Sequence, residues 1–188
     1  MAIRIYGNRA IATLPGEQTR PTPARVREAL FNIWQGRVAG ARWLDICAGS
    51  GAMGAEALCR GADSAVGIEK LGRACQLVEA NWNKVRRSEQ EVRVLRGDAV
   101  RGLAELEGDR FDAIYFDPPY ASGLYRPVLA AIARFELLAD DGEIAVEHAR
   151  DRRDFIDRLG VADDLLRCPI CYRTKTYGQT AISFFRYD

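Results

Sequence analysis

The 188-residue sequence predicts an α/β fold, in which helices cover both faces of a seven-stranded, mostly parallel sheet with an antiparallel last strand. The main observation is that apolar strand-like segments alternate with amphipathic helix-like segments between residues 41 and 147. Such alternation indicates βαβ units with right-handed crossovers. The second observation is a pair of alternating apolar segments near the C-terminus, separated by Tyr177-Gly178-Gln179, which predicts a hairpin at one edge of the sheet.

Residues 1–22 are expected to form a basic N-terminal extension or small hairpin, and residues 23–188 the main domain. Thr22 is predicted to cap the first helix, with Pro23 as its first helical residue. Gly36 is the expected stop signal of that helix.

Four further helices and seven strands are expected, each marked by the spacing of its apolar residues. The helix over residues 71–85, for example, has Leu71, Val78 and Trp82 on one face. The expected strands span residues 41–47, 64–68, 92–95, 111–116, 143–147, 164–172 and 180–187, and the expected helices span residues 52–60, 71–85, 99–106 and 124–135.

The composition excludes several classes of protein. No run approaches the roughly 20 apolar residues that span a bilayer, and the start of the chain lacks the regions of a signal peptide. Five mostly dispersed cysteines indicate a reducing compartment, so a cytoplasmic location is expected. A single C-x-x-C pair, Cys168 and Cys171, lies on an expected strand without a second pair, so no metal site is predicted.

The net charge of +1 does not by itself indicate a nucleic-acid partner. The basic residues are nevertheless uneven, since residues 1–40 contain six arginines against Glu17 and Glu28. Such a segment can contact phosphates, although a solvated surface explains the charge equally well. Arg25 and Arg27 stand near the start of a helix, where the helix dipole disfavours cations, which hints that they serve a ligand.

A glycine-rich loop, residues 49–54, follows the first strand of the main domain and has the spacing G-x-G-x-x-G. Gly49 is expected to permit the tight turn, Gly51 to let a ligand approach the backbone, and Gly54 to let the helix pack closely on the strand. Because this spacing also marks dinucleotide-binding dehydrogenases, a nicotinamide-dependent oxidoreductase is one alternative.

Acidic residues around this loop favour a different ligand. Asp45 would repel a pyrophosphate but suits a cationic ammonium group, and Glu69 ends the next strand, where an acid can bind ribose hydroxyls. Asp98 is placed either to accept from an adenine amine or to cap a helix. An ammonium group and a ribose without a pyrophosphate describe S-adenosylmethionine. The adjacent cofactor-binding candidates are Ala48, Ser50, Lys70 and Ala99.

The strand over residues 111–116 ends at Asp117-Pro118-Pro119-Tyr120, which holds an acid and an aromatic ring on a stiff loop. Asp117 and the carbonyl of Pro118 can accept both hydrogens of an exocyclic amine on a base. That would orient the nitrogen toward a methyl donor and stabilise the charge that develops on it. Tyr120 can stack on the base, which must leave any helical stack to reach the site. These four residues are the predicted catalytic loop.

Together these motifs resemble the bacterial small-subunit (16S) ribosomal RNA guanine-N2 methyltransferases. The stretches that carry the resemblance, which covers nearly the whole chain, are residues 19–32, 45–57, 117–125, 146–148 and 177–184. The resemblance implies a Rossmann-like class I methyltransferase fold and S-adenosylmethionine as the methyl donor. It also implies a partner, the small ribosomal subunit or its RNA, in which one guanine is methylated at N2. The chain is expected to act as a monomer, without a membrane or a metal.

The chain also departs from this family. The family's basic N-terminal hairpin has two arginines where this sequence has one, Arg9, and Cys47 stands in place of a usual phenylalanine. Arg9, Thr22 and Arg25 are the candidate RNA-binding residues. Thr22 and Arg25 border the expected site, where either the cofactor carboxylate or the RNA is their expected ligand. Two alternatives stay open besides the oxidoreductase. One is amine methylation of adenine N6 or guanine N2 in another RNA or in DNA, and the other is a nucleic-acid-binding module without catalysis.

Overall fold

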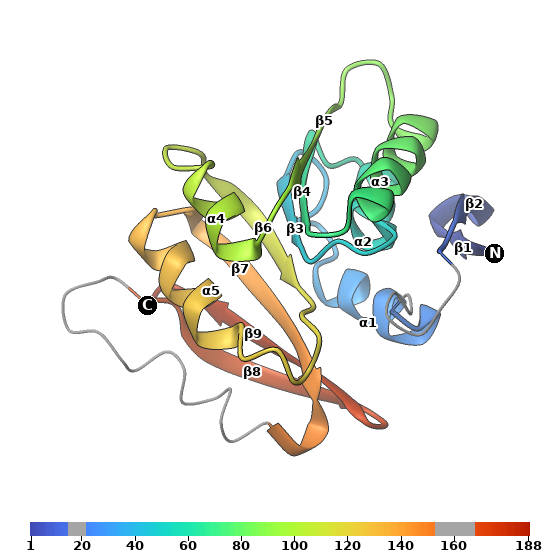
Figure 1. Cartoon of the computed structure of the whole chain (residues 1–188). Coiled ribbons are helices and arrows are strands. Elements are labelled where there is room, and N and C mark those ends of the chain that lie inside the picture. The colour runs from blue at the N-terminus through green and yellow to red at the C-terminus, as the bar shows by residue number, and fades with distance from the viewer. Residues whose placement is uncertain (15–21, 153–167) are drawn as a thin grey trace.

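The computed structural model describes residues 1–14, 22–152 and 168–188. A seven-stranded sheet forms its centre, with the strand order β5-β4-β3-β6-β7-β9-β8 (Figure 1). The five strands from β5 to β7 are parallel, β9 is antiparallel to β7, and β8 is antiparallel to β9. The strands are β3 (Arg42–Ile46), β4 (Ser64–Glu69), β5 (Glu91–Arg96), β6 (Phe111–Phe116), β7 (Leu138–Ala149), β8 (Ile170–Tyr177) and β9 (Thr180–Arg186).

Helices cover both faces of the sheet (Figure 1). The helices α1 (Ala24–Ile33), α2 (Ala52–Cys59) and α3 (Gly72–Val85) pack on one face, and α4 (Ala99–Ala104) and α5 (Tyr125–Arg134) on the other. The central strand β6 serves both layers, because Ala113 and Tyr115 belong to the first core cluster and Ile114 and Phe116 to the second. The predicted fold class is confirmed.

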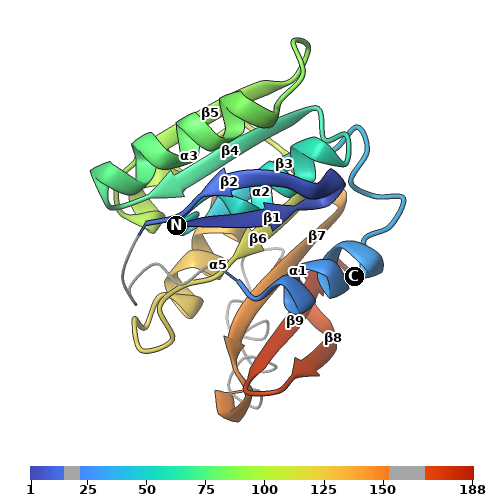
Figure 2. The ribbon, with the colours of Figure 1, turned by 90° about the vertical axis from the view of Figure 1, so that its right-hand side faces the viewer.

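The N-terminal residues form a hairpin, β1 (Ala2–Ile5) and β2 (Arg9–Ala12), joined by the short helix η1 (Tyr6–Asn8). Figure 2 shows this hairpin in front of α2. Its buried Ile5 and Ile11 join the core of that face. The Asn81 amide of α3 bonds both the backbone nitrogen and the carbonyl of Ala12, at 3.0 and 2.9 Å. A boundary between an extension and a main domain at residue 22 stays a prediction.

Three predicted element boundaries are corrected. The α1 helix begins at Ala24 after Pro23, and Thr22 makes no capping hydrogen bond because its hydroxyl instead bonds that of Tyr115. Strand β7 starts at residue 138 rather than 143, since a register shift against β6 lets the turn-like residues 139–142 continue the strand. Strand β8 runs from residue 170 to 177 rather than from 164 to 172, and residues 164–167 lie outside the described residues.

None of the helices in the described ranges is long and apolar enough to cross a membrane. Over the same ranges, no three His, Cys, Asp or Glu side chains gather where they could hold a metal ion.

Candidate active site

The candidate residues gather where the chain leaves adjacent parallel strands. The chain runs from β3 outward to β4 and β5, and then returns to the other side of β3 as β6. The carboxyl ends of β3 and β6 therefore flank the point at which the strand order reverses, which is where open α/β sheets bind ligands. A backbone hydrogen bond of 3.3 Å from the Asp117 nitrogen to the Ile46 carbonyl joins the two strand ends.

The glycine-rich loop contains two left-handed residues that confirm the tight turn. Gly49 has φ 58° and Gly51 has φ 71°. A side chain at Gly49 would have only the Cys47 carbonyl oxygen near it, at 4.0 Å, so its side of the loop is open. At Gly51, by contrast, a Cβ would lie 2.7 Å from Nε1 of Trp82. The open approach expected at Gly51 is therefore found at Gly49.

Trp82 of α3 explains the other glycines of this region. Its buried indole fills the space that side chains at Gly51, Gly54 and Gly67 would occupy, with Cβ distances of 2.7, 2.3 and 2.8 Å. Its Nε1 donates to the Gly51 carbonyl at 2.7 Å. Gly54 thus permits close packing, as predicted, but against a tryptophan of the next helix rather than against the strand itself.

Glu69 fastens the turn that follows β4 to the glycine-rich loop. Its Oε2 accepts from the Gly49 nitrogen at 2.9 Å and its Oε1 from the Leu71 nitrogen at 2.8 Å. Carboxylate oxygens have further lone pairs, so these bonds leave acceptor capacity for hydroxyl groups. Glu69, which is predicted to bind a ribose, therefore holds the backbone of the glycine-rich loop at Gly49.

Asp45 is buried in β3 beneath the glycine-rich loop. Its Oδ2 accepts from the Gly54 nitrogen at 3.0 Å. Burial raises the pKa of Asp45 to about 8, although the Gly54 hydrogen bond lowers it, and the charge of Glu69 adds to the increase. A buried carboxyl group with a raised pKa favours a bound cation, which returns it to the ionised form.

Asp98 follows β5 and caps α4, because its Oδ1 accepts from the nitrogens of Val100 and Arg101 at 3.0 and 3.4 Å. Of the two roles that the sequence offers for Asp98, the helix cap is therefore confirmed. Ser50 is buried and its carbonyl accepts from Asn81 at 2.9 Å, whereas Lys70 is exposed. Ala48 lies half-buried just before the glycine-rich loop, and Ala99 is buried in the first turn of α4.

The loop after β6 is stiff in the way its sequence predicts. Pro118 is buried, Pro119 is exposed, and the Pro119 carbonyl accepts from the Ser122 nitrogen at 2.8 Å, closing a turn. Tyr120 stands on this turn with its side chain partly exposed, and burial raises the pKa of its hydroxyl to about 12. The ring is therefore accessible while its hydroxyl stays protonated at neutral pH.

Glu147 of β7 connects the catalytic loop to the sheet. It is buried, and its two oxygens accept from two tyrosines: Oε2 from the Tyr115 hydroxyl, and Oε1 from the Tyr120 hydroxyl at 3.3 Å. The Tyr120 hydroxyl also lies 3.2 Å from Oγ1 of Thr180, and the Tyr115 hydroxyl 3.2 Å from Oγ1 of Thr22. One buried carboxylate thus fixes two tyrosine hydroxyls, of which that of Tyr115 is buried and that of Tyr120 is partly exposed.

The charge of Glu147 also affects the ionisation of Asp117. Burial, followed by the charges of Glu147 and Asp45, raises the pKa of Asp117 well above its ordinary value. Burial also raises the pKa of Glu147, although the hydroxyls of Tyr115 and Tyr120 hold it down. Since strongly perturbed carboxyl groups gather at functional sites, this pair supports the prediction that the loop is catalytic.

Sequence reasoning gave Tyr115 no role in the site and placed Glu147 and Thr180 only within stretches that match the family. The available signal was the aromatic residue within the strand before Asp117 and an acid inside an otherwise apolar strand. A buried acid in an apolar strand requires a partner, so Glu147 could have been singled out.

The N-terminal candidates have varied partners. Arg9 donates to the Val85 carbonyl at 2.9 Å and to the Cys59 sulfur at 3.5 Å, so it fastens the hairpin to the domain. Arg27, interpreted as serving a ligand, is instead buried in an ion pair with Glu56. Arg25 is exposed at the start of α1.

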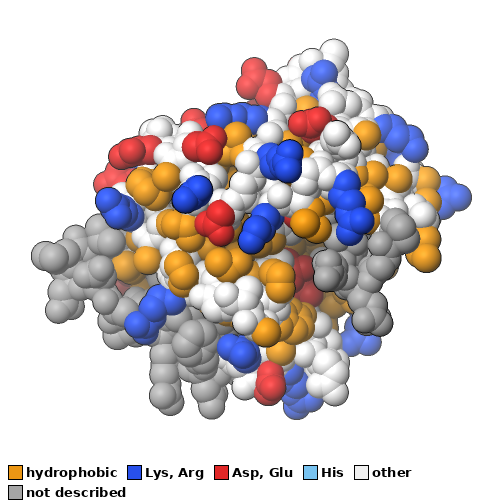
Figure 3. Space-filling model, in the orientation of Figure 1, with side chains coloured by type: hydrophobic (Ala, Val, Ile, Leu, Met, Phe, Trp, Pro, Cys, Tyr) orange, Lys and Arg blue, Asp and Glu red, His pale blue; other side chains and the backbone are white. Residues whose placement is uncertain are grey.

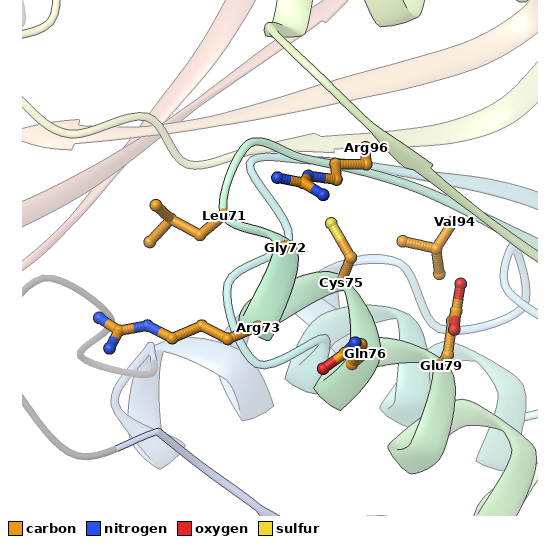
Figure 4. Close-up of a pocket in the computed structure, with 8 residues that line it drawn as sticks. All are labelled: Leu71, Gly72, Arg73, Cys75, Gln76, Glu79, Val94 and Arg96. Carbon is orange, nitrogen blue, oxygen red and sulfur yellow. The ribbon is translucent and has the colours of Figure 1, made fainter.

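Two surface hollows lie near the site. One, of about 640 Å³, is lined by the turn after β4, the first turns of α3 and strand β5, and Figure 4 shows Arg96 beside Leu71 and Gly72 there. It contains none of the predicted cofactor residues. The other, of about 590 Å³, is lined by Tyr120, Ala149, Arg150, Asp151 and Gln179. The second hollow therefore opens beside the predicted catalytic loop.

Comparison with protein families gives a match over nearly the whole chain. The family described as "Conserved hypothetical protein 95" matches residues 3–186. The chain belongs to this family. A Bacillus subtilis relative named "Putative rRNA methyltransferase YlbH" is 32% identical over 180 residues, which cover 95% of this chain and 93% of the relative.

Two Escherichia coli matches agree with this family. The protein named "Ribosomal RNA small subunit methyltransferase D" is 36% identical over 128 residues, covering 68% of this chain and 63% of the relative. A solved structure described as "Putative methyltransferase yhhF from Escherichia coli" has a TM-score of 0.79 and 30% identity, covering 100% of this chain and 99% of that one. The predicted family resemblance is confirmed. The names of these relatives specify methyltransferases and ribosomal RNA, not a target base.

Proposed function

We propose that this chain transfers a methyl group from S-adenosylmethionine to the exocyclic N2 amine of a guanine in small-subunit ribosomal RNA. The observation that carries the proposal is the junction of two strand ends. Asp117, the proposed acceptor of the amine hydrogens, is bonded through its backbone to the end of β3. The glycine-rich loop and Asp45, the proposed donor-binding residues, belong to that same strand end. Relatives named as ribosomal RNA methyltransferases support the substrate class.

The residues at the ends of β3, β4 and β5 fit the methyl donor. S-adenosylmethionine, when bound, supplies an electrophilic methyl group on a sulfonium. Asp45 would pair with its ammonium group, and the raised pKa of the Asp45 carboxyl would fall beside that cation. Glu69 would accept from the ribose hydroxyls while holding the Gly49 amide. Asp98 would accept from the adenine amine through Oδ2, since Oδ1 caps α4.

The loop after β6 fits an exocyclic amine on a planar base. The nitrogen of such an amine is a poor nucleophile because its lone pair is delocalised into the ring. Asp117 and the Pro118 carbonyl would accept both amine hydrogens and orient the nitrogen, and Tyr120 would stack on the base. Positive charge develops on the nitrogen during transfer, so the interaction with ionised Asp117 strengthens in the transition state. The product loses its proton to water.

The proposed partner is the small ribosomal subunit or its RNA, in the cytoplasm, with the chain acting as a monomer. The test compares incorporation of labelled methyl groups from S-adenosylmethionine into small subunits, free small-subunit RNA and duplex DNA. We expect incorporation into the subunits or their RNA and none into DNA. No incorporation into either ribosomal substrate would contradict the proposed substrate, and incorporation into DNA would favour the alternative amine methylation.

A further inference from the structure

The surface as a whole is not strongly basic. The net charge is +1, and Figure 3 shows Lys and Arg side chains spread over one face of the molecule among acidic and uncharged ones. The number of cations therefore does not mark a surface for an anionic RNA strand. Their position relative to the candidate active site is more informative.

Strand β8 forms one edge of the sheet and presents two cations on one face. Arg173 pairs with Phe184 of β9, and Lys175 pairs with Ile182. Residues paired directly across antiparallel strands point to the same face of a sheet. Since Phe184 and Ile182 belong to the core cluster on the α1 side, both cations lie on that side. Arg173 and Lys175 are themselves exposed.

This face continues to the catalytic loop without a break. Two residues beyond Lys175, Tyr177 pairs with Thr180, which in turn pairs with Ala149 of β7. The Thr180 hydroxyl lies 3.2 Å from that of Tyr120. Ala149 and Tyr120 also line the hollow of about 590 Å³. Arg173, Lys175 and Tyr177 thus form a row, spaced roughly 6.5 Å apart, that ends at the proposed base-stacking residue.

A third cation, Arg25, is exposed at the start of α1, which packs on the same face of the sheet as Tyr177. Burial raises the pKa of Tyr177, while the charges of Arg173 and Arg25 lower it. The guanidinium carbon of Arg173 lies 6.0 Å from the centre of the Phe184 ring, so its stem covers apolar surface.

The cations of this row are also available for a ligand. The ion pairs found among the described residues use other arginines: Arg27, Arg37, Arg42, Arg60 and Arg110. The cations at the N-terminal hairpin are engaged as well, since Arg4, Arg9 and Lys84 donate to the carbonyls of Asn8, Val85 and Ala10.

We propose that the RNA backbone next to the target nucleotide lies along the α1-side face of β8, with its phosphates on Arg173, Lys175 and Arg25. This inference rests on the proposed function for its partner. A base stacked on Tyr120 would place its flanking phosphates beside Thr180 and Tyr177, and the row continues from there. The expected contacts are with phosphates, so they give affinity and register rather than base specificity.

The test uses a double variant, Arg173→Ala with Lys175→Ala, and a control of equal charge, Arg93→Ala with Arg134→Ala. The control side chains are exposed on β5, the opposite edge strand, and on α5. Binding to small ribosomal subunits and to a small-subunit RNA transcript is measured from 50 to 200 mM salt. Methyl transfer and S-adenosylmethionine affinity are measured on the same proteins.

For the double variant we expect a KM for subunits raised about 10-fold or more at low salt, with kcat and cofactor affinity unchanged. The logarithm of the RNA-binding constant decreases with the logarithm of the salt concentration. This slope should become less negative by about 0.7 to 0.9 for each lost phosphate contact. The control should match the unmodified protein. The inference is overturned if the double variant keeps the original salt slope and KM. If the double variant binds RNA more weakly than the control and with a smaller salt dependence, but the unmodified protein transfers no methyl group, the proposed reaction fails while the binding surface stands.

Discussion

The Tyr120 hydroxyl donates a hydrogen bond of 3.3 Å to Oε1 of Glu147, whose other oxygen accepts from the Tyr115 hydroxyl. One buried carboxylate of β7 therefore holds both the residue proposed to stack on the base and a tyrosine of the strand that carries Asp117. We infer that Glu147 positions the catalytic loop without contacting the base.

Glu147→Gln should lower kcat about 10-fold. The glutamine amide keeps one acceptor oxygen but presents a donor where the second tyrosine hydroxyl needs an acceptor, and a hydrogen bond to a charged group contributes about 1.5–3 kcal/mol. Steady-state kinetics with small subunits measures the change, and the KM for S-adenosylmethionine should not move. Tyr120→Phe is the matched control, because the double variant should lose little more than either single one. Additive losses would contradict a role for Glu147 through Tyr120.

The same Glu147→Gln variant should shift the pH dependence of transfer. Transfer requires ionised Asp117, so activity is present above the pKa of Asp117 and is lost as the pH falls through it. Burial and the negative charge of Glu147 raise that pKa, so removing the charge lowers it. The acid limb of kcat/KM should therefore move to lower pH. An acid limb that moves to higher pH would contradict this assignment.

Asp45→Asn should abolish S-adenosylmethionine binding, measured by calorimetry, and yet stabilise the empty protein near pH 8. Burial raises the pKa of Asp45 from 3.8 to about 8, so the folded protein holds a proton that the unfolded chain releases. Its contribution to stability is thus present at low pH and declines as the pH rises from about 4 to 8, by up to about 1.4 kcal/mol per unit. Unfolding of the variant should show a weaker decline. A variant that binds the cofactor normally would refute the ammonium pairing.

Two glycine substitutions should separate cofactor binding from packing. Gly54→Ala places a Cβ 2.3 Å from Trp82, so we expect a loss of about 1–3 kcal/mol in the free energy of unfolding. Gly49→Ala meets open space but a positive φ, and should cost about 1–2 kcal/mol while weakening cofactor binding. Denaturant titration and calorimetry measure the two quantities. Unaltered cofactor affinity in Gly49→Ala would show that the loop does not approach the ligand there.

The sequence allowed the fold to be predicted because its local signals agree with the long-range pairing. In β6 the apolar run from Ala113 to Phe116 has both faces buried, as expected for a central parallel strand. The predictions that were wrong concern residues whose contacts are made with residues far away in the sequence. Thr22 has the sequence of a helix cap, but a tyrosine 93 residues further along the chain takes its hydroxyl. The motif predicts that a ligand approaches the backbone at Gly51, but Trp82 fills the space beside this glycine.

The candidate site shows the same limit. Asp45, Glu69 and Asp117 could be identified because each acid ends or follows a strand within a recognisable motif. Their partners could not, since nothing near Glu147 in the sequence shows that two tyrosines share it. The prediction that Arg27 serves a ligand was wrong. It considered only the dipole of the helix that carries Arg27, whereas the ion-pair partner, Glu56, lies on another helix.

The most direct test of the central claim is analysis of nucleosides from small-subunit RNA after reaction with the unmodified protein and with Asp117→Ala, with methyl sites mapped to single nucleotides. The account predicts N2-methylguanosine at one position with the unmodified protein. It predicts none with Asp117→Ala, although that variant should bind S-adenosylmethionine with largely unchanged affinity. A methyl group on any other atom, or normal methylation by Asp117→Ala, would contradict it.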